Sequence, residues 1–166
     1  MTSFALLPLL GAGCPPNQSG TRYFLVAERE PAQGDSYILP LTDPAAIAHA
    51  LALINHPDST DAPLVVAKIS PGGSDGEYVN RDLAGSGEAW SWRVSAFEGF
   101  ADFTIEVQDG WPGYVEDNYD DYTASSGGYI GFWNYTVVRE VQVSEMAYDD
   151  FAPADFPPNS PLANLP

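Results

Sequence analysis

Hydrophobic and polar residues alternate along several short stretches of the chain. The clearest stretches are residues 90–95, 101–107 and 133–143. A period of two places successive side chains on opposite faces of a β-strand, and such alternation is typical of antiparallel sheets with one buried face. The pattern predicts that Trp92 and Ile105 are buried while Arg93 and Glu106 are more exposed.

Three further stretches predict strands, and one predicts a helix. The strands are residues 23–27, 37–41 and 64–69, of which 37–41 either pairs with 23–27 or leads into the helix. Asp43 is a suitable N-cap with Pro44 at the first helical position, and the chain reaches Asn55-His56-Pro57 at the helix end. Between them the apolar residues repeat at helical spacing: Ile47, Ala50, Leu51 and Ile54. We therefore expect an α+β domain, antiparallel and β-rich, with one main amphipathic helix.

A second, short acidic helix is predicted to begin at Pro112. In it Val115, Tyr119 and Tyr122 share one face, and the outward positions are Glu116, Asp117, Asp120 and Asp121. Asp120 and Asp121 would then lie near the C-terminal end of this helix. That end carries partial negative charge, so the placement is unfavourable without compensation by water, salt or a cation.

The two ends of the chain differ from its middle. We predict a signal-like apolar segment and linker over residues 1–20, one globular domain over 21–145, and a Pro-rich acidic tail over 146–166. An apolar run ending in small residues before Cys14 is typical of an export signal, and acylation of Cys14 would anchor the chain to a membrane. The alternative is an apolar arm packed on the domain or on a neighbouring subunit. We expect an extracytoplasmic protein that is periplasmic, on the cell surface or secreted.

Composition narrows the range of partners. Six Lys or Arg against 23 Asp or Glu give a net charge of −17, which repels nucleic acid and anionic membranes and attracts cations and basic proteins. A membrane contact is therefore expected only through a lipid anchor. Cys14 is the only cysteine, which excludes an internal disulfide and a cysteine-based zinc site.

Oxygen ligands are the remaining choice for a metal. The candidate ligands for Ca²⁺ are Asp109, Glu116, Asp117, Asp120 and Asp121. The segment is not an EF-hand, because Tyr122 replaces the required Gly and Gly128 replaces the closing Glu. The alternative interpretation is a solvated acidic face.

The tryptophans are candidates for carbohydrate stacking or for the core. Trp90, Trp92 and Trp133 lie on apolar strand positions, which favours core packing, whereas Trp111 precedes Pro112 in a loop and is the candidate surface contact. The only histidines, His49 and His56, are interpreted as a surface and a helix-capping residue. No nucleophile elbow accompanies them, so no enzymatic activity is expected.

The order of several motifs resembles a known family. DPAAIAHALALI, LVVAKI, YVNRDLAGSGEAWSWRV, FADFTIEVQDGWPGYVED and GFWNYTVVREV are similar to the N-terminal domain of a calmodulin-binding protein, a small domain of exported bacterial proteins. The resemblance covers residues 23–141 and implies a fold more than an activity. It implies that Gln108 and a position at or beside Gly131 replace a cysteine pair, and are therefore close in space. Arg93 replaces a family His, whose role cannot be transferred.

These observations predict an exported, non-catalytic accessory or binding domain. It would contact a protein partner, of basic character, through its acidic face and its terminal arms. Phe151 and Phe156 are the expected anchors of the tail, on this domain's own sheet or on another subunit. The alternative is a secreted module that binds Ca²⁺ or carbohydrate.

Overall fold

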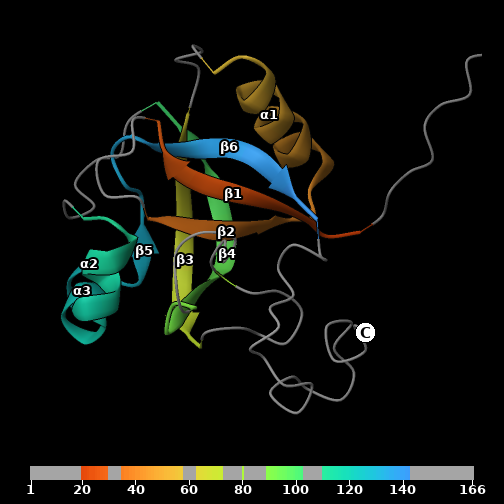
Figure 1. Ribbon diagram of the computed structural model, residues 1–166. Helices are drawn as coiled ribbons and strands as arrows, with labels where there is room; N and C mark the ends of the chain where they lie inside the picture. The colour runs from red at the N-terminus through yellow and green to blue at the C-terminus, as the bar shows by residue number, and fades with distance from the viewer. Residues whose placement is uncertain are drawn as a thin grey trace, which may run out of the picture.

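The computed structural model describes residues 20–29, 35–57, 63–72, 80, 89–102 and 110–142. These residues form two three-stranded antiparallel sheets and three helices, which confirms the predicted α+β class. Sheet A has the order β2-β1-β6 and consists of β1 (Arg22–Glu28), β2 (Ser36–Leu41) and β6 (Tyr135–Val141). Sheet B has the order β4-β3-β5 and consists of β3 (Leu64–Pro71), β4 (Trp92–Ala101) and β5 (Tyr129–Ile130). Figure 1 shows the strands of sheet A crossing those of sheet B, which lies behind it.

Sheet A settles the two alternatives for residues 37–41. The stretch is β2, and it pairs with β1 in a register that places Leu25 opposite Ile38. The central strand β1 is buried on both faces, because Phe24 and Val26 face sheet B while Tyr23 and Leu25 are buried on the opposite face. Strand β1 is therefore not half-exposed, although its side chains alternate as expected.

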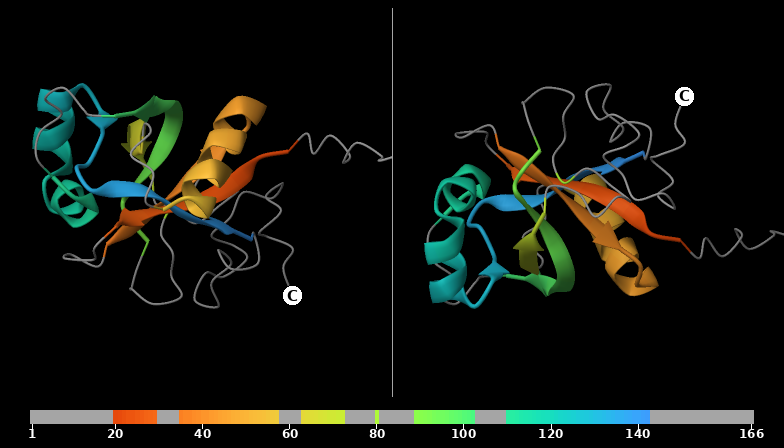
Figure 2. Two further views of the ribbon diagram at one scale, coloured as in Figure 1. Left: turned by 90° about the horizontal axis from the view of Figure 1, so that it is seen from above. Right: turned by 90° about the horizontal axis from the view of Figure 1, so that it is seen from below.

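Helix α1 (Pro44–Asn55) begins where the sequence predicts. The Asp43 carboxylate accepts a hydrogen bond of 2.8 Å from the Ala46 N–H, and the helix ends at His56. Its buried face includes Ile47, Ala50 and Leu53. Leu51 and Ile54 are partly buried and pack against the same core. Seen from above, α1 and sheet B lie on the same side of sheet A (Figure 2).

The N-cap gives a first testable prediction. Asp43→Ala should lower the free energy of unfolding by about 1 kcal/mol, because one N–H of the first turn loses its acceptor. Urea unfolding followed by circular dichroism measures this change. Asp43→Asn retains an acceptor oxygen and should stay close to the original stability, so an equal loss in both variants would contradict the capping role.

Sheet B confirms the predicted orientation around Trp92. Trp92 is fully buried and Arg93 is half-buried, whereas Ile105 and Glu106 lie outside the described residues. Strand β4 continues through Ala101, so it joins the first predicted strand to the start of the second. Two register shifts along β3 accommodate this length, one after Val66 and one after Lys68.

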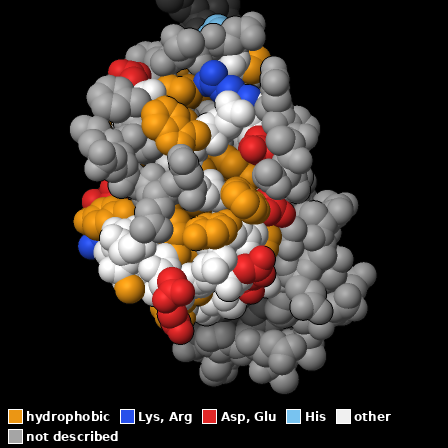
Figure 3. Space-filling view, turned by 90° about the vertical axis from the view of Figure 1, so that its left-hand side faces the viewer, with side chains coloured by type: hydrophobic (Ala, Val, Ile, Leu, Met, Phe, Trp, Pro, Cys, Tyr) orange, Lys and Arg blue, Asp and Glu red, His pale blue; other side chains and the backbone are white. Residues whose placement is uncertain are grey.

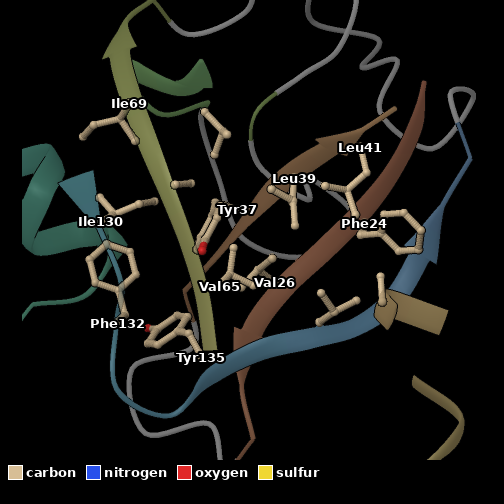
Figure 4. Packing of buried hydrophobic residues seen from close by; sticks show 14 of the residues in the cluster. Phe24, Val26, Tyr37, Leu39, Leu41, Val65, Ile69, Ile130, Phe132 and Tyr135 are labelled. Carbon is tan, nitrogen blue, oxygen red and sulfur yellow. The ribbon is translucent and has the colours of Figure 1, made fainter. Parts of the chain in front are cut away.

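The core fills the space between the two sheets. Figure 4 shows Tyr37, Leu39 and Val26 from sheet A packed against Val65 of β3, with Phe132 and Tyr135 beside them. Helix α1 adds Ile47 and Ala50 to the same cluster.

Asn80 joins the two sheets at their edges. Its side chain donates to the carbonyls of Trp90 and Trp92 and accepts from the Trp90 N–H, while its own carbonyl accepts from the Ile38 N–H. The indole N–H of Trp90 donates to the Ser36 carbonyl at 2.8 Å. These bonds connect the start of β4 to β2 and give buried Asn80 a structural role.

Candidate functional site

The predicted acidic helix is in fact two helices, α2 (Pro112–Asp117) and α3 (Tyr119–Ser126). Asn118 separates them, and its side-chain amide donates to the Tyr114 carbonyl at 3.0 Å. Asp120 and Asp121 therefore lie in the first turn of α3, not near the C-terminal end of a single helix. The expected unfavourable placement is wrong, because the N-terminal end of a helix favours negative charge.

The two faces of this helix pair are as predicted. Val115 and Tyr122 are buried, and Tyr119 packs partly buried against the core. Asp117, Asp120 and Asp121 are exposed. The apolar face attaches the helices to the domain and leaves the carboxylates in solvent.

Glu116 is the exception among these acids. Its carboxylate accepts hydrogen bonds from the N–H of Ser91 at 2.8 Å and from the Ser91 hydroxyl at 3.0 Å. Glu116 therefore fastens α2 to the residues that precede β4. Of the other candidate calcium ligands, Asp109 lies outside the described residues. Within the part of the chain that the structure describes, no three His, Cys, Asp or Glu side chains lie together to hold a metal ion.

Trp111 is exposed in the loop that precedes α2, where the sequence places a surface contact. The exposed fraction of this residue is 37%. Its ring lies 5.5 Å from the ring of Tyr114. The Gly113 N–H donates to the Asp35 carboxylate at 3.0 Å, and a Cβ atom at Gly113 would lie only 2.7 Å from the same oxygen. Glycine at this position therefore allows Asp35 to approach the Trp111 loop.

Trp133 is exposed as well, which corrects the prediction that it packs in the core. Its exposed fraction is 52%, whereas neighbouring Phe132 is buried. Strand β6 begins only at Tyr135, and Asn134 turns the chain with a φ of 72° in the left-handed region. The alternation therefore holds from Tyr135 onward and does not include Trp133.

Strand pairing brings the two exposed tryptophans to one end of the domain. The register places Ala27 opposite Ser36, and Glu28 opposite Tyr135. Asp35 holds the Trp111 loop beside the start of β2, and the Arg29 N–H donates to the Asn134 carbonyl beside Trp133. We call this surface the aromatic–acidic end and define it by Trp111, Tyr114, Trp133 and Asp35. Figure 3 shows hydrophobic and acidic side chains together on the α2–α3 side of the molecule.

Carboxylates give this end a negative contribution to its electrostatics. Burial is the main cause that raises the pKa of the Tyr135 hydroxyl, and the nearby charges of Glu28 and Asp35 raise it further. The exposed carboxylates of α2 and α3 lie on the helices that follow Trp111 and add to this charge. A positively charged contact surface is the electrostatic complement of such an end.

Both histidines serve the fold. The backbone N–H of His56 donates to the Ala52 carbonyl at 2.9 Å, which confirms its capping role. His49 is half-buried, and its ring stacks on Phe100 at 4.5 Å with 13° between the planes. The His49 ring therefore packs α1 against β4.

Several predicted positions lie outside the described residues. They are Cys14, Gln108, Asp109, Phe151 and Phe156. The proximity of Gln108 and Gly131 therefore stays a prediction. None of the described helices is both long and apolar enough to cross a membrane.

Two residues of this region have roles that sequence patterns did not indicate. Asp35 and Glu116 each accept a hydrogen bond from a backbone N–H far along the chain, of Gly113 and Ser91 respectively. Long-range side-chain contacts of this kind have no local periodicity. The Gly113 that follows Trp-Pro was the only local signal.

Comparison with known proteins identifies a family. The sequence model for the N-terminal domain of a bacterial calmodulin-binding-like protein family matches residues 20–144. The match spans every described helix and strand, from β1 to β6. No curated protein and no solved structure matches the chain.

Proposed function

We propose, from the premise that this chain belongs to the family of N-terminal domains of bacterial calmodulin-binding-like proteins, that it is an extracytoplasmic, non-catalytic domain that binds a protein partner through the aromatic–acidic end. The observation that carries this proposal is the exposure of Trp111 and Trp133 on one end of the domain. Tryptophan buries more apolar area than most side chains and is enriched among residues that dominate binding energy. Two such side chains in solvent are well suited to a contact surface.

The charge of the chain supports a basic partner. The net charge of −17 produces a negative field, and Asp117, Asp120 and Asp121 contribute exposed carboxylates on the helices next to Trp111. Such a field accelerates encounters with positive surfaces and excludes acidic ones. The tryptophans would supply the affinity and the carboxylates the selectivity.

Two further observations support the remaining parts of the proposal. The participation of both histidines in the fold supports a non-catalytic role. The apolar segment before Cys14 supports export, either with a cleaved signal or with a lipid on Cys14. The acidic residues on α2 and α3 then face an extracytoplasmic medium.

Carbohydrate binding is the second candidate function. The observation that favours it is the pairing of the Trp111 and Tyr114 rings beside the Asp35 carboxylate. Aromatic faces with a few fixed polar groups are typical of small-ligand sites. Calcium binding receives less support, because Glu116 is already engaged by Ser91.

Substitution of the two exposed tryptophans tests the proposal. A partner is first recovered by cross-linking to the full chain in the envelope of an exporting bacterial host, then purified and measured by titration calorimetry. The double variant Trp111→Ala/Trp133→Ala should weaken binding at least about tenfold, because each truncation at a binding centre costs more than about 1 kcal/mol.

Val138→Ala is the matched control, since Val138 has the same exposed fraction as Trp111, 37%, but lies on β6 beside α1. Unchanged affinity in the double variant would refute the proposed surface. Binding of the full chain to a glycan array that is lost in Trp111→Ala alone would favour the carbohydrate function instead.

A further inference from the structure

The outer face of sheet A carries a second apolar cluster. Phe24 and Val26 of β1 face sheet B, so the intervening side chains point the other way. The members of this outer cluster are Tyr23, Leu25, Ile38 and Val141, each less than 9% exposed. The cluster is separate from the aromatic–acidic end, so an occupant of this face is independent of the proposed function.

The described residues do not account for the burial of the outer cluster. Ala89 is the partly buried hydrophobic residue that packs against it, and Asn80 contributes a backbone bond to Ile38. A single methyl group from Ala89 cannot cover four large side chains. A further segment must therefore cover this face.

A groove adjoins the outer cluster and shares Tyr23 with it. The groove has a volume of about 430 Å³. On one side it is lined by Pro40, the strand partner of Tyr23, and on the other by Arg93–Phe97 of β4. Apolar walls with a guanidinium at the rim suit an aromatic side chain next to a carboxylate.

We propose that the C-terminal segment, residues 143–166, folds back over the outer cluster and seats its phenylalanines, Phe151 and Phe156, against the groove. Strand β6 ends at Val141, which is itself a member of the outer cluster and pairs with Tyr23 of the groove. The segment therefore begins at the surface that needs a cover. Phe151 follows closely enough to reach a groove that starts at the neighbouring strand.

Charge complementarity points to the same occupant. The segment contains Glu145, Asp149, Asp150 and Asp155 and no Lys or Arg. The chain has only six basic residues in all, and two of them border this surface: Arg93 lines the groove, and Arg139 lies opposite Leu25 in the sheet register. An acidic segment with aromatic anchors therefore matches the outer face in both charge and polarity.

The contact makes the outer face self-occupied. The family match ends at residue 144, so the segment that we place on this face lies almost entirely beyond the family domain. Any partner that approaches the groove must displace the segment, which gives the chain an intramolecular competitor at that surface.

Thiol accessibility in the full chain tests this inference. Ser95 is exposed and lines the groove, so Ser95→Cys in a Cys14→Ser background places a reporter thiol there. Adding Phe151→Ala and Phe156→Ala should raise the alkylation rate of that thiol by about tenfold, because the segment loses its anchors and leaves the groove.

Two controls match this design. Ser125→Cys places a thiol on α3, where Ser125 is exposed and bonds a main-chain carbonyl as Ser95 does, and its rate should not change. Asn159→Ala alters a polar residue of the same segment and should leave the Ser95→Cys rate unchanged.

The outcomes are distinguishable. An unchanged rate at position 95 in the Phe151→Ala/Phe156→Ala chain would overturn the proposal. Protection that depends on protein concentration would also overturn it, because a second copy would then supply the segment. If the double variant fails to fold by circular dichroism, Arg93→Glu/Arg139→Glu replaces it, with the same expected rise in rate through charge repulsion and the same refuting result.

Discussion

Trp92→Ala should lower the free energy of unfolding by about 3–5 kcal/mol, the range for truncating a large aromatic residue in a core. The Trp92 side chain is fully buried. Its ring stacks on Trp90 at 6.0 Å and lies 5.9 Å from Tyr37, so it joins β4 to sheet A across the core. Removing it leaves a cavity that the two sheets cannot close without shifting against each other.

Trp133→Ala is the matched control, since it truncates the same residue type at a position that is 52% exposed. It should change stability by no more than about 0.5 kcal/mol, as substitutions at exposed sites usually do. Urea unfolding followed by far-UV circular dichroism measures both variants without relying on tryptophan fluorescence. Similar losses in the two variants would contradict the assignment of Trp92 to the core and of Trp133 to the surface.

The sequence predicted those parts of the fold that depend on local periodicity and capping. Alternation around Trp92 assigned the buried face of β4, because period two is a direct consequence of strand geometry. Asp43 and Pro44 located the start of α1 through the N-cap hydrogen bond that forms with Ala46. Both signals arise within a few residues of the chain.

The errors arose where a local turn interrupts a pattern. Asn134 adopts a left-handed conformation just before β6, so the apparent alternation at Trp133 precedes the strand. Asn118 divides the acidic helix, although Val115 and Tyr122 still face the core on both sides of the break. Periodicity records the buried face and does not record where the backbone leaves the element.

The candidate site depended on information that the sequence does not contain locally. Trp111 was predicted to be exposed because it precedes a proline in a loop, but its proximity to Trp133 follows from the pairing of β1 with both β2 and β6. Strand order and register depend on long-range packing. The aromatic–acidic end is therefore visible only in the fold.

Three buried tyrosines make the stability of the protein sensitive to alkaline pH. The hydroxyls of Tyr37, Tyr122 and Tyr135 have no hydrogen-bond partner in the structure. Burial raises the pKa of Tyr122 to about 12, with a contribution from Tyr114, and it raises the pKa of Tyr37 and of Tyr135 well above the ordinary value. The neutral phenol is therefore favoured in the folded state, because the buried site cannot solvate a phenolate.

The sign of the effect follows from linkage. A folded-state pKa above the unfolded value of about 10 means that the stabilisation is complete below pH 10 and is lost as the pH rises through the folded-state value. Each such tyrosine costs about 1.4 kcal/mol per pH unit in this window. Three together cost about 4 kcal/mol per unit, so a domain with a stability of about 5–15 kcal/mol should lose most of it between about pH 10 and 12.

The measurement is the urea midpoint at a series of pH values, followed by circular dichroism and by tyrosinate absorbance. Tyr37→Phe should reduce the alkaline loss by about 1.4 kcal/mol per pH unit, because one of the three titrating groups is gone. At neutral pH the same variant should be as stable as the parent or more stable, since it removes a buried hydroxyl that has no partner. Tyr129→Phe controls for loss of a hydroxyl at a half-exposed tyrosine, which packs under Lys68. An alkaline slope that is the same in Tyr37→Phe as in the parent would show that burial of this phenol does not govern the loss.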